Sequence, residues 1–300
     1  KVFDGVGPGL SAPTDVLVRG NRIAAIGDGA RPTASARVIE GHGRTLMPGL
    51  IDVHWHSTLT ALSQADLLAP DASPEKLAAT VATESARTLL RGFTSVRDAG
   101  GPIFELKAAI DAGKMPGPRI WPSGAFVSQT SGHGDLRQPH ERSRRFFGKP
   151  SMAEEMGATV LAAARRDVLT AVRENLRMGA SQIKLMAGGG TSSAYDPVDV
   201  TQYTLDEMRA AVEAAADWGT YVTVHAYTVH AVRRAIEAGV KCVEHGQMLD
   251  EATLRLMAER GVWLSSQILP PSNDAMDPLR REKRKPVIEG QPRMWAMAKK

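Results

Sequence analysis

The sequence lacks the features that mark several classes of protein. Its 300 residues include one cysteine, Cys242, which excludes an intrachain disulfide and a cysteine-rich zinc module. No apolar run reaches the roughly 18 residues of a membrane-spanning helix, so we expect no membrane partner. No signal peptide is visible, but the chain begins at Lys1 and we expect further sequence before it. The sequence therefore does not decide between a cytoplasmic and an exported protein.

The excess of positive charge is small. The formal net charge is +4, and the basic residues concentrate in 137–149 and 281–285. No aromatic or groove-binding pattern surrounds either run, so we interpret both as solvated loops and expect no nucleic-acid partner. The balance of 43% apolar and 23% charged residues is that of an ordinary globular protein.

Residues 1–47 are rich in turn signals and short alternations of apolar and polar residues. The segment 15–29, DVLVRGNRIAAIGDG, alternates around RGN, which is typical of a β-hairpin. Residues 36–49 add another strand and a Gly/Pro break. We interpret 1–47 as the N-terminal part of a small β domain, a β-sandwich, and 48–300 as a second domain.

After Pro48, short apolar runs alternate with helical stretches. Helices are predicted over 73–92 and 204–219, because Ser73 and Thr204 are N-cap residues and a glycine ends each stretch. Alternation of strands and helices predicts a parallel sheet. The seven strand runs are 49–56, 94–100, 119–128, 182–190, 220–227, 241–246 and 262–269.

The predicted fold class is α/β. An open doubly wound sheet would usually carry a glycine fingerprint after its first strand, whereas this first strand is buried through Ile51 and ends in His54 and His56. A TIM-like (β/α)8 barrel, truncated before strand eight, fits this order better. In such barrels the functional residues lie at the C-terminal ends of the strands.

Histidines occupy the ends of the predicted strands. His54 and His56 end the first strand, and side chains two apart on a strand share a face, so both should point into the barrel mouth. His225 and His245 lie in the fifth and sixth strands. A single strand histidine is more often a hydrogen-bonded core residue. Four at strand ends favour a metal site, because neutral imidazole is a common ligand for zinc and related ions.

Lys184 lies in the fourth strand run. A buried lysine there could pair with a carboxylate, form a Schiff base, bind phosphate or, as a carbamate, bridge two metal ions. The glycines at 188–190 have no Walker or dinucleotide spacing and are interpreted as a turn. Regular alternation points Cys242 and Glu244 away from the face of His245, so we expect Cys242 in the core against the helices and do not assign Glu244 as a ligand.

These motifs together resemble the amidohydrolase superfamily. The matching segments are PGLIDVHWH at 48–56, Lys184, VTVHA around His225 and VEHG around His245. TSGHGD at 130–135 and HAYT at 225–228 further resemble the imidazolonepropionase-like, prolidase-like branch, with its Xaa-Pro-type dipeptidases and ochratoxin-hydrolysing amidases.

The resemblance implies a site for two divalent metal ions, with zinc as the first choice. His54 and His56 would hold one ion, His225 and His245 the other, and a carboxylated Lys184 would bridge them. A hydroxide generated by the metal pair would attack the amide carbonyl.

The resemblance also implies two residues that contact the substrate. His133 matches a position suited to hydrogen-bonding the scissile carbonyl oxygen, which makes it the candidate catalytic side chain. The alternative for His133 is a polar loop residue. Tyr227 matches a position suited to the terminal carboxylate of the substrate.

One part of the family pattern is absent. An aspartate at the end of strand eight should ligate the first metal and move the proton, yet no GTD- or GSD-like segment occurs. We therefore predict that the chain is a piece of a longer protein and that 293–300, RMWAMAKK, lies in the helix before that strand.

The predicted function is hydrolysis of the amide bond of dipeptides or N-acyl amino acids that carry a free carboxylate, with ochratoxin A as a candidate. The alternatives are a cyclic-amide hydrolase of the imidazolonepropionase type and a metal-binding relative without catalysis. The expected partner is a small-molecule amide, and the resemblance implies a homo-oligomer.

Overall fold

The structure, a computed structural model, describes residues 1–67, 69 and 71–299. These residues form two compact units, Lys1–Leu50 and Ile51–Lys300. No helix in the described part of the chain is long and apolar enough to cross a membrane.

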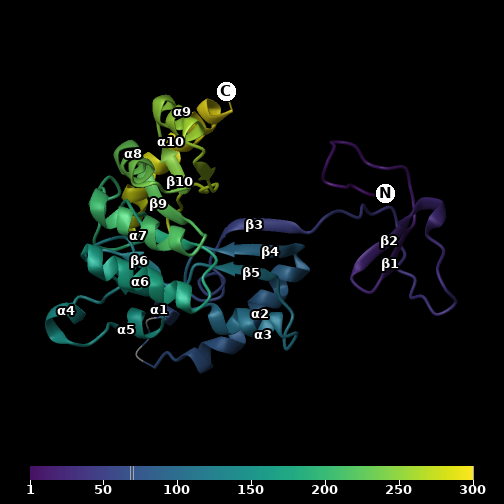
Figure 1. The fold of residues 1–300 in the computed structure, drawn as a ribbon, viewed down its shortest axis with the longest axis horizontal. Helices are drawn as coiled ribbons and strands as arrows, with labels where there is room; N and C mark the ends of the chain where they lie inside the picture. Colours follow the sequence, from purple (N-terminus) through teal and green to yellow (C-terminus); the bar gives the residue numbers. More distant parts are fainter. Residues whose placement is uncertain (68, 70, 300) are drawn as a thin grey trace. The chain divides into compact units, whose positions relative to one another are not determined.

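The smaller unit contains a two-stranded antiparallel sheet (Figure 1). Strand β1 (Val16–Arg19) pairs with β2 (Arg22–Ile26), and a 3-10 turn, Gly27–Gly29, follows. Gly20 occupies the turn with φ of 58°, a conformation that glycine adopts without steric strain. The hairpin predicted around RGN is therefore confirmed.

Parallel strands form the interior of the larger unit. A three-stranded sheet has the order β3-β4-β5, and a six-stranded sheet has the order β11-β10-β9-β8-β6-β7. The bounds are β3 (Leu50–Trp55), β4 (Phe93–Asp98), β5 (Arg119–Pro122), β6 (Phe126–Ser128), β7 (Thr159–Leu161), β8 (Ile183–Met186), β9 (Val222–Thr228), β10 (Cys242–Met248) and β11 (Trp263–Ser265).

Helices alternate with these strands along the chain (Figure 1). Their bounds are α1 (Gln64–Leu67), α2 (Pro74–Leu90), α3 (Phe104–Asp111), α4 (Arg144–Phe147), α5 (Met152–Glu155), α6 (Arg165–Arg177), α7 (Leu205–Asp217), α8 (Val229–Ala238), α9 (Glu251–Glu259) and α10 (Pro278–Ala298). The α/β class with parallel strands is confirmed, and β7 is a strand that the sequence patterns did not predict.

The third predicted strand, 119–128, is divided in the structure. Its first part is β5, which pairs with β4, and its second part is β6, which pairs with β7 and β8. The backbone N–H of Ser181 donates to the carbonyl of Pro122 at 2.7 Å, which joins the end of β5 to the segment before β8. The described strands thus form two sheets that meet at this broken strand, and no single closed ring of paired strands is present among them.

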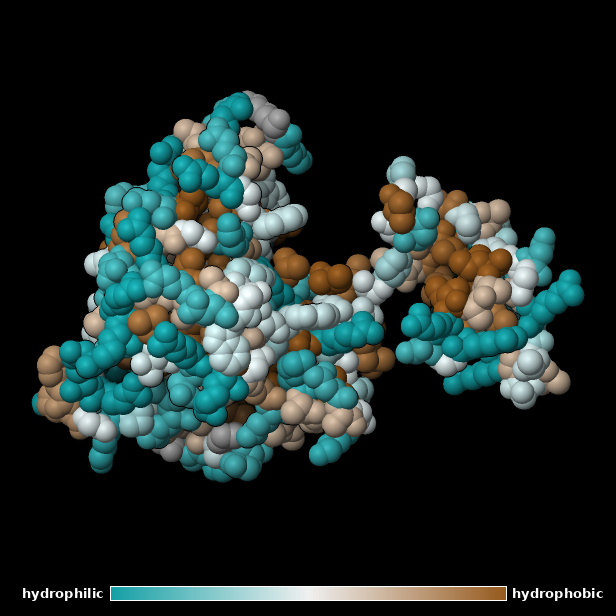
Figure 2. All heavy atoms as spheres, viewed as in Figure 1, coloured by the Kyte–Doolittle hydropathy of each residue, from teal (hydrophilic) through white to brown (hydrophobic). Residues whose placement is uncertain are grey.

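Strands β3 and β11 lie at sheet edges. Ile51 and Val53 on β3 are 66% and 49% exposed, and Trp263 on β11 is also exposed. Figure 2 shows apolar side chains gathered along β3. The expectation that the first strand is buried through Ile51 is wrong for this chain, because among the described strands β3 pairs with β4 alone.

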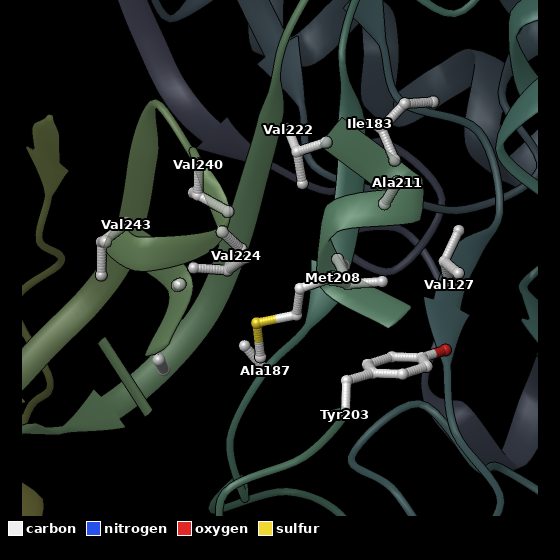
Figure 3. Close-up of a cluster of buried hydrophobic side chains, with 14 of the residues drawn as sticks. Val127, Ile183, Ala187, Tyr203, Met208, Ala211, Val222, Val224, Val240 and Val243 are labelled. Atoms are coloured by element: carbon white, nitrogen blue, oxygen red, sulfur yellow. The ribbon is translucent and has the colours of Figure 1, made fainter. Parts of the chain in front are cut away.

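One large apolar cluster fills the space between the six-stranded sheet and α6, α7 and α8. Figure 3 shows Val222 and Val224 of β9 beside Met208 and Ala211 of α7, with Val243 of β10 near Val240. Small alanines on the helices allow close approach to the β-branched residues of the strands, and interiors of this kind are packed as densely as organic crystals. This rigid packing holds the strand ends that carry the site.

The predicted N-caps of α2 and α7 are confirmed. The hydroxyl oxygen of Ser73 accepts a hydrogen bond from the N–H of Lys76. Thr204 forms a capping box, in which its hydroxyl accepts from the N–H of Glu207 while that glutamate accepts from the N–H of Thr204 at 2.8 Å. The box satisfies backbone donors at the start of α7 that would otherwise lack partners.

Replacing Thr204 with alanine should lower the free energy of unfolding by about 1 kcal/mol, because two hydrogen bonds at the start of α7 are lost. Urea denaturation monitored by circular dichroism measures this change. Thr83→Ala, at an exposed position inside α2, is the control and should leave stability unchanged or slightly raised. Equal losses in the two variants would argue against a role for the capping box.

The two basic runs are not simply solvated loops. Residues 281–285 lie inside α10, where Arg284 is buried and donates to the carbonyl of Pro270 at 2.6 Å. Part of 137–149 forms the short helix α4, with Arg145 paired to Asp167 at 2.9 Å. Local composition could not predict this, because burial of a cation depends on distant partners.

Candidate metal centre

Four histidines converge inside the larger unit. The ring centroids of His54 and His56 lie 5.1 Å apart, those of His54 and His245 4.7 Å apart, and those of His225 and His245 4.4 Å apart. They come from β3, from the residue after it, and from β9 and β10, as the strand-end pattern predicts. The structure therefore brings together all four histidines singled out in the sequence.

Backbone carbonyls fix the orientation of two of these imidazoles. Nδ1 of His56 donates to the carbonyl of Gly100, and Nε2 of His225 donates to the carbonyl of Gly189, each at 3.0 Å. A carbonyl oxygen can only accept, so these nitrogens carry the protons of neutral rings. The lone pair is then on Nε2 of His56 and on Nδ1 of His225, where it can bind a metal ion.

Burial keeps the histidines neutral. Burial, together with the charges of His54 and Lys184, lowers the pKa of His56 to about 3. Burial is also the main reason that the pKa values of His225 and His245 lie well below the ordinary value, with neighbouring histidines adding to the effect. Neutral imidazole is the form that ligates metals.

Lys184 lies among these histidines on β8. Its side chain is 1% exposed, and its ammonium makes no hydrogen bond or ion pair with the described residues. Burial lowers the pKa of Lys184 to about 8, although the charge of Glu244 opposes this. With this pKa the lysine is mostly charged at pH 7, but about a tenth of it is neutral, far more than for an ordinary lysine. The neutral amine is the form that reacts with carbon dioxide to give a carbamate.

Glu244 faces the centre, contrary to the alternation expected from the sequence. Its Oε2 accepts a hydrogen bond from Nδ1 of His54 at 2.7 Å. The reason is that His245 has φ of 78° and the pairing of β9 with β10 becomes irregular after it, so consecutive side chains no longer alternate across the sheet. Both Glu244 and His245 therefore reach the same interior.

Arg97 and Cys242 adjoin Glu244. Arg97 donates from Nη2 to Oε1 of Glu244 at 2.5 Å, and Sγ of Cys242 lies 3.5 Å from the same oxygen. Cys242 is buried, as predicted, but it lies beside this ion pair and not against the helices. Burial would raise the pKa of Glu244, but the hydrogen bond from His54 and the charges of Lys184 and Arg97 outweigh it and hold that pKa far below its usual range.

Asp98 at the end of β4 is a second carboxylate that the sequence patterns missed. It accepts from the backbone N–H groups of Ser57 and Gly100 at 2.7 and 3.0 Å. Burial raises the pKa of Asp98 to about 6, against the lowering effect of these hydrogen bonds. Asp98 thereby holds Ser57, which follows His56 in the sequence, and Gly100, whose carbonyl accepts from the His56 ring. Asp98 could have been picked out from the sequence by its position at the end of a predicted barrel strand, where functional residues lie.

His133 lies flat between His225 and a glycine. Its ring stacks on that of His225 with centroids 4.0 Å apart. A Cβ on Gly190 would come within 1.9 Å of the His133 ring, so the third glycine of the 188–190 run permits this close approach. The glycines at 188–190 were interpreted only as a turn, but Gly190 also leaves space for the ring of His133.

A polar network holds the other side of His133. Its Nδ1 lies 2.8 Å from Oγ of Ser193, and its backbone N–H donates to the side-chain oxygen of Gln202 at 3.0 Å. Lys283 of α10 donates to the carbonyl of Ser193 at 2.7 Å. The basic run of α10 thus ties the loop that carries Ser193 to the rest of the unit.

Tyr227 is buried beside the histidines. Its ring centroid lies 4.9 Å from that of His225 and 5.2 Å from that of His245. Burial raises the pKa of its hydroxyl, so the phenol remains a hydrogen-bond donor at neutral pH. The remaining histidines, His42, His140 and His230, are exposed.

The donor set is chemically suited to metal ions. Three imidazoles have their second nitrogen fixed by a partner, and Lys184 is enclosed by the group. No cluster of three or more His, Cys, Asp or Glu side chains that could hold an ion is found within residues 1–67, 69 and 71–299.

Cavity size does not identify this centre. A cavity of about 610 Å³ lies between β7 and α6, and none of the histidines lines it. Charged residues of α6, among them Arg166 and Asp167, form part of its wall. We place the candidate site at the histidines because of their chemistry, since buried titratable groups with shifted pKa values cluster at functional sites.

The chain belongs to the amidohydrolase family, whose profile matches residues 45–289. An ochratoxinase of Aspergillus niger is 34% identical over 222 residues, which are 72% of this chain and 46% of that protein. This chain therefore spans about half the length of that relative.

Solved structures agree with this assignment. A prolidase in complex with N-methylphosphonate-L-proline has a TM-score of 0.83 and 34% identity, over 95% of this chain and 71% of that chain. A Xaa-Pro dipeptidase with methionine bound in its active site has a TM-score of 0.77 and 27% identity, over 99% of this chain and 74% of that chain. The family and the branch predicted from the sequence motifs are confirmed.

Proposed function

We propose that this protein is a metal-dependent hydrolase of amide bonds. The observation that carries the proposal is the convergence of four neutral imidazoles, shielded from solvent to different degrees, around Lys184. Metal ions held there would lower the pKa of a bound water and polarise the carbonyl under attack. Divalent ions suit the site best, with zinc as the first choice, because imidazole is its common ligand.

Each residue has a proposed role. His54 and His56 would hold one ion, His225 and His245 would hold the other, and Lys184, as a carbamate, would supply a ligand to both. His133 donates a hydrogen bond to the carbonyl oxygen of the scissile amide, where a fixed donor stabilises the developing negative charge. Tyr227 donates its phenolic proton to the carboxylate of the substrate.

The proposed substrates are dipeptides or N-acyl amino acids with a free carboxylate. Relatives named as a prolidase, a Xaa-Pro dipeptidase and an ochratoxinase support this choice. The buried phenol of Tyr227 can donate to an anionic group at that end, and the charge of Arg284 acts on this phenol more strongly than the opposing charge of Asp196. Ochratoxin A is one candidate within this class.

Removal of metal tests the proposal. Dialysis against a chelator should abolish hydrolysis of Xaa-Pro dipeptides and N-acyl amino acids, and added zinc or cobalt should restore it. Product analysis by mass spectrometry, with a cyclic amide as a parallel substrate, separates linear from ring amides. Activity that persists in metal-free protein would refute the proposal. Faster hydrolysis of the cyclic amide than of the linear amides would instead support a hydrolase of the imidazolonepropionase type.

A further inference from the structure

We propose that Glu244 is a positioning residue that holds His54 in the tautomer with a free Nε2, and that Arg97 anchors Glu244 for this purpose. The proposal rests on the proposed function in one respect, since it takes His54 to be a metal ligand. It concerns which ring nitrogen of His54 is protonated in the metal-free protein.

The carboxylate of Glu244 is fully used by protein donors. It is 0% exposed. Its Oε2 accepts from Nδ1 of His54 at 2.7 Å, while its Oε1 accepts from Nη2 of Arg97 at 2.5 Å and from the hydroxyl of Thr223. A carboxylate with both oxygens occupied in this way is arranged to hold its neighbours and not to ligate an ion itself.

The hydrogen bond decides where the proton of His54 is. An ionised carboxylate only accepts, so Nδ1 of His54 must carry the proton and Nε2 must carry the lone pair. Metal-binding histidines usually have such a partner on the second nitrogen, which fixes the ring and makes it a better ligand. For His56 and His225 the partners are backbone carbonyls, whereas His54 depends on a side chain.

Arg97 binds both to the backbone next to His54 and to the carboxylate of Glu244. Its Nε donates to the carbonyl of Val53, the residue before His54, at 2.7 Å, and its Nη1 lies 3.3 Å from the hydroxyl of Tyr221. The guanidinium thus connects the backbone of β3 to the carboxylate on β10, across the interior of the unit. A planar fork with several donors suits this bridging geometry better than a lysine would.

Glu244→Gln is the sharpest test, because the side chain keeps its shape. The amide oxygen can still accept from Arg97 and Thr223, which leaves the NH2 group facing Nδ1 of His54. That nitrogen must then accept, so the proton moves to Nε2 and the lone pair needed for a metal ion is lost. We expect metal affinity at this site to fall by about 10- to 100-fold.

Two measurements follow the change. Ring 15N chemical shifts of His54 in the metal-free protein should report protonated Nδ1 in the wild type and protonated Nε2 in Glu244→Gln. Competition with a chromogenic chelator gives the affinity for zinc. Glu244→Asp, which retains the charge, should keep the wild-type tautomer and recover part of the affinity, and it also serves if the glutamine variant fails to fold.

Glu237→Gln is the matched control. Glu237 lies on α8, is 63% exposed and pairs with Arg209 at 3.5 Å, so its replacement should leave tautomer and affinity unchanged. The same tautomer in wild type and Glu244→Gln, or equal zinc affinities, would overturn the inference. If the wild type binds no divalent ion, the proposed function fails, while the ring 15N shifts still decide whether Glu244 sets the tautomer.

Discussion

Lys184→Met is expected to reduce kcat/KM by roughly 10³-fold or more while making the metal-free protein more stable. The loss of activity follows because bridging metal ions supply several kcal/mol of transition-state stabilisation, and each ~1.4 kcal/mol corresponds to a factor of ten in rate. Methionine has a similar length but offers no group that could become a carbamate.

The gain in stability follows from the pKa of Lys184. Burial lowers it from 10.5 in the unfolded chain to about 8 in the folded protein. Below about pH 8 the lysine is charged in both states, and its buried charge opposes folding, so the unfolded state binds the proton more tightly. Each pKa unit corresponds to ~1.4 kcal/mol, so methionine should raise the free energy of unfolding at pH 7 by roughly 1–3 kcal/mol.

Lys241→Met is the matched control for this prediction. Lys241 is exposed and directly precedes β10, so its replacement should change neither kcat/KM nor stability by much. Urea denaturation of the metal-free proteins and initial rates on a Xaa-Pro dipeptide measure the two effects. Wild-type activity in Lys184→Met would exclude the lysine from the metal centre.

Local signals allowed much of the fold to be predicted. The caps Ser73 and Thr204 and the RGN hairpin are decided by residues close in sequence, and all three are confirmed. The break between β5 and β6 was not predicted, although the sequence PSG at 122–124 is a local turn signal. Which sheet each half joins depends on the pairing of β5 with β4 and of β6 with β8, which local sequence does not show. Exposure of Ile51 likewise depends on which strands lie beside β3.

The sequence predicted which histidines come together at the candidate site but not the residues that support them. Strand-end histidines are visible in sequence because an imidazole in an apolar run is unusual. Glu244 was missed because strict alternation holds only for a regular strand, and β10 is irregular at His245. Gly246, which has φ of 67°, was the available signal, since a glycine inside a strand often marks a bulge.

Contacts between distant loops had no signal in the sequence. His133 and Gly190 are 57 positions apart by number, and nothing local indicates that the ring of one lies against the backbone of the other. The same is true of Lys283 on α10, which reaches the carbonyl of Ser193. Tertiary packing alone brings these residues together, and the close approach of Gly190 to His133 is what makes a side chain at position 190 damaging.

Gly190→Ala is therefore expected to lower kcat/KM by about 10²-fold, the loss typical of one misplaced donor to the carbonyl oxygen. The new Cβ would come within 1.9 Å of the ring of His133. Stacking on His225, with ring centroids 4.0 Å apart, limits the room into which the ring of His133 could move. Overpacking of this kind should also lower the free energy of unfolding by about 1–3 kcal/mol.

A double-mutant cycle separates this clash from a general backbone effect. In the His133→Ala background there is room for the Cβ, so adding Gly190→Ala should change neither kcat/KM nor stability further. Gly7→Ala, where a Cβ would meet nothing within 4 Å, is the neutral control. If Gly190→Ala is equally damaging with and without His133, the glycine is needed for the loop itself. If the damage disappears with the imidazole, Gly190 is there to give His133 its place beside the metal ligands.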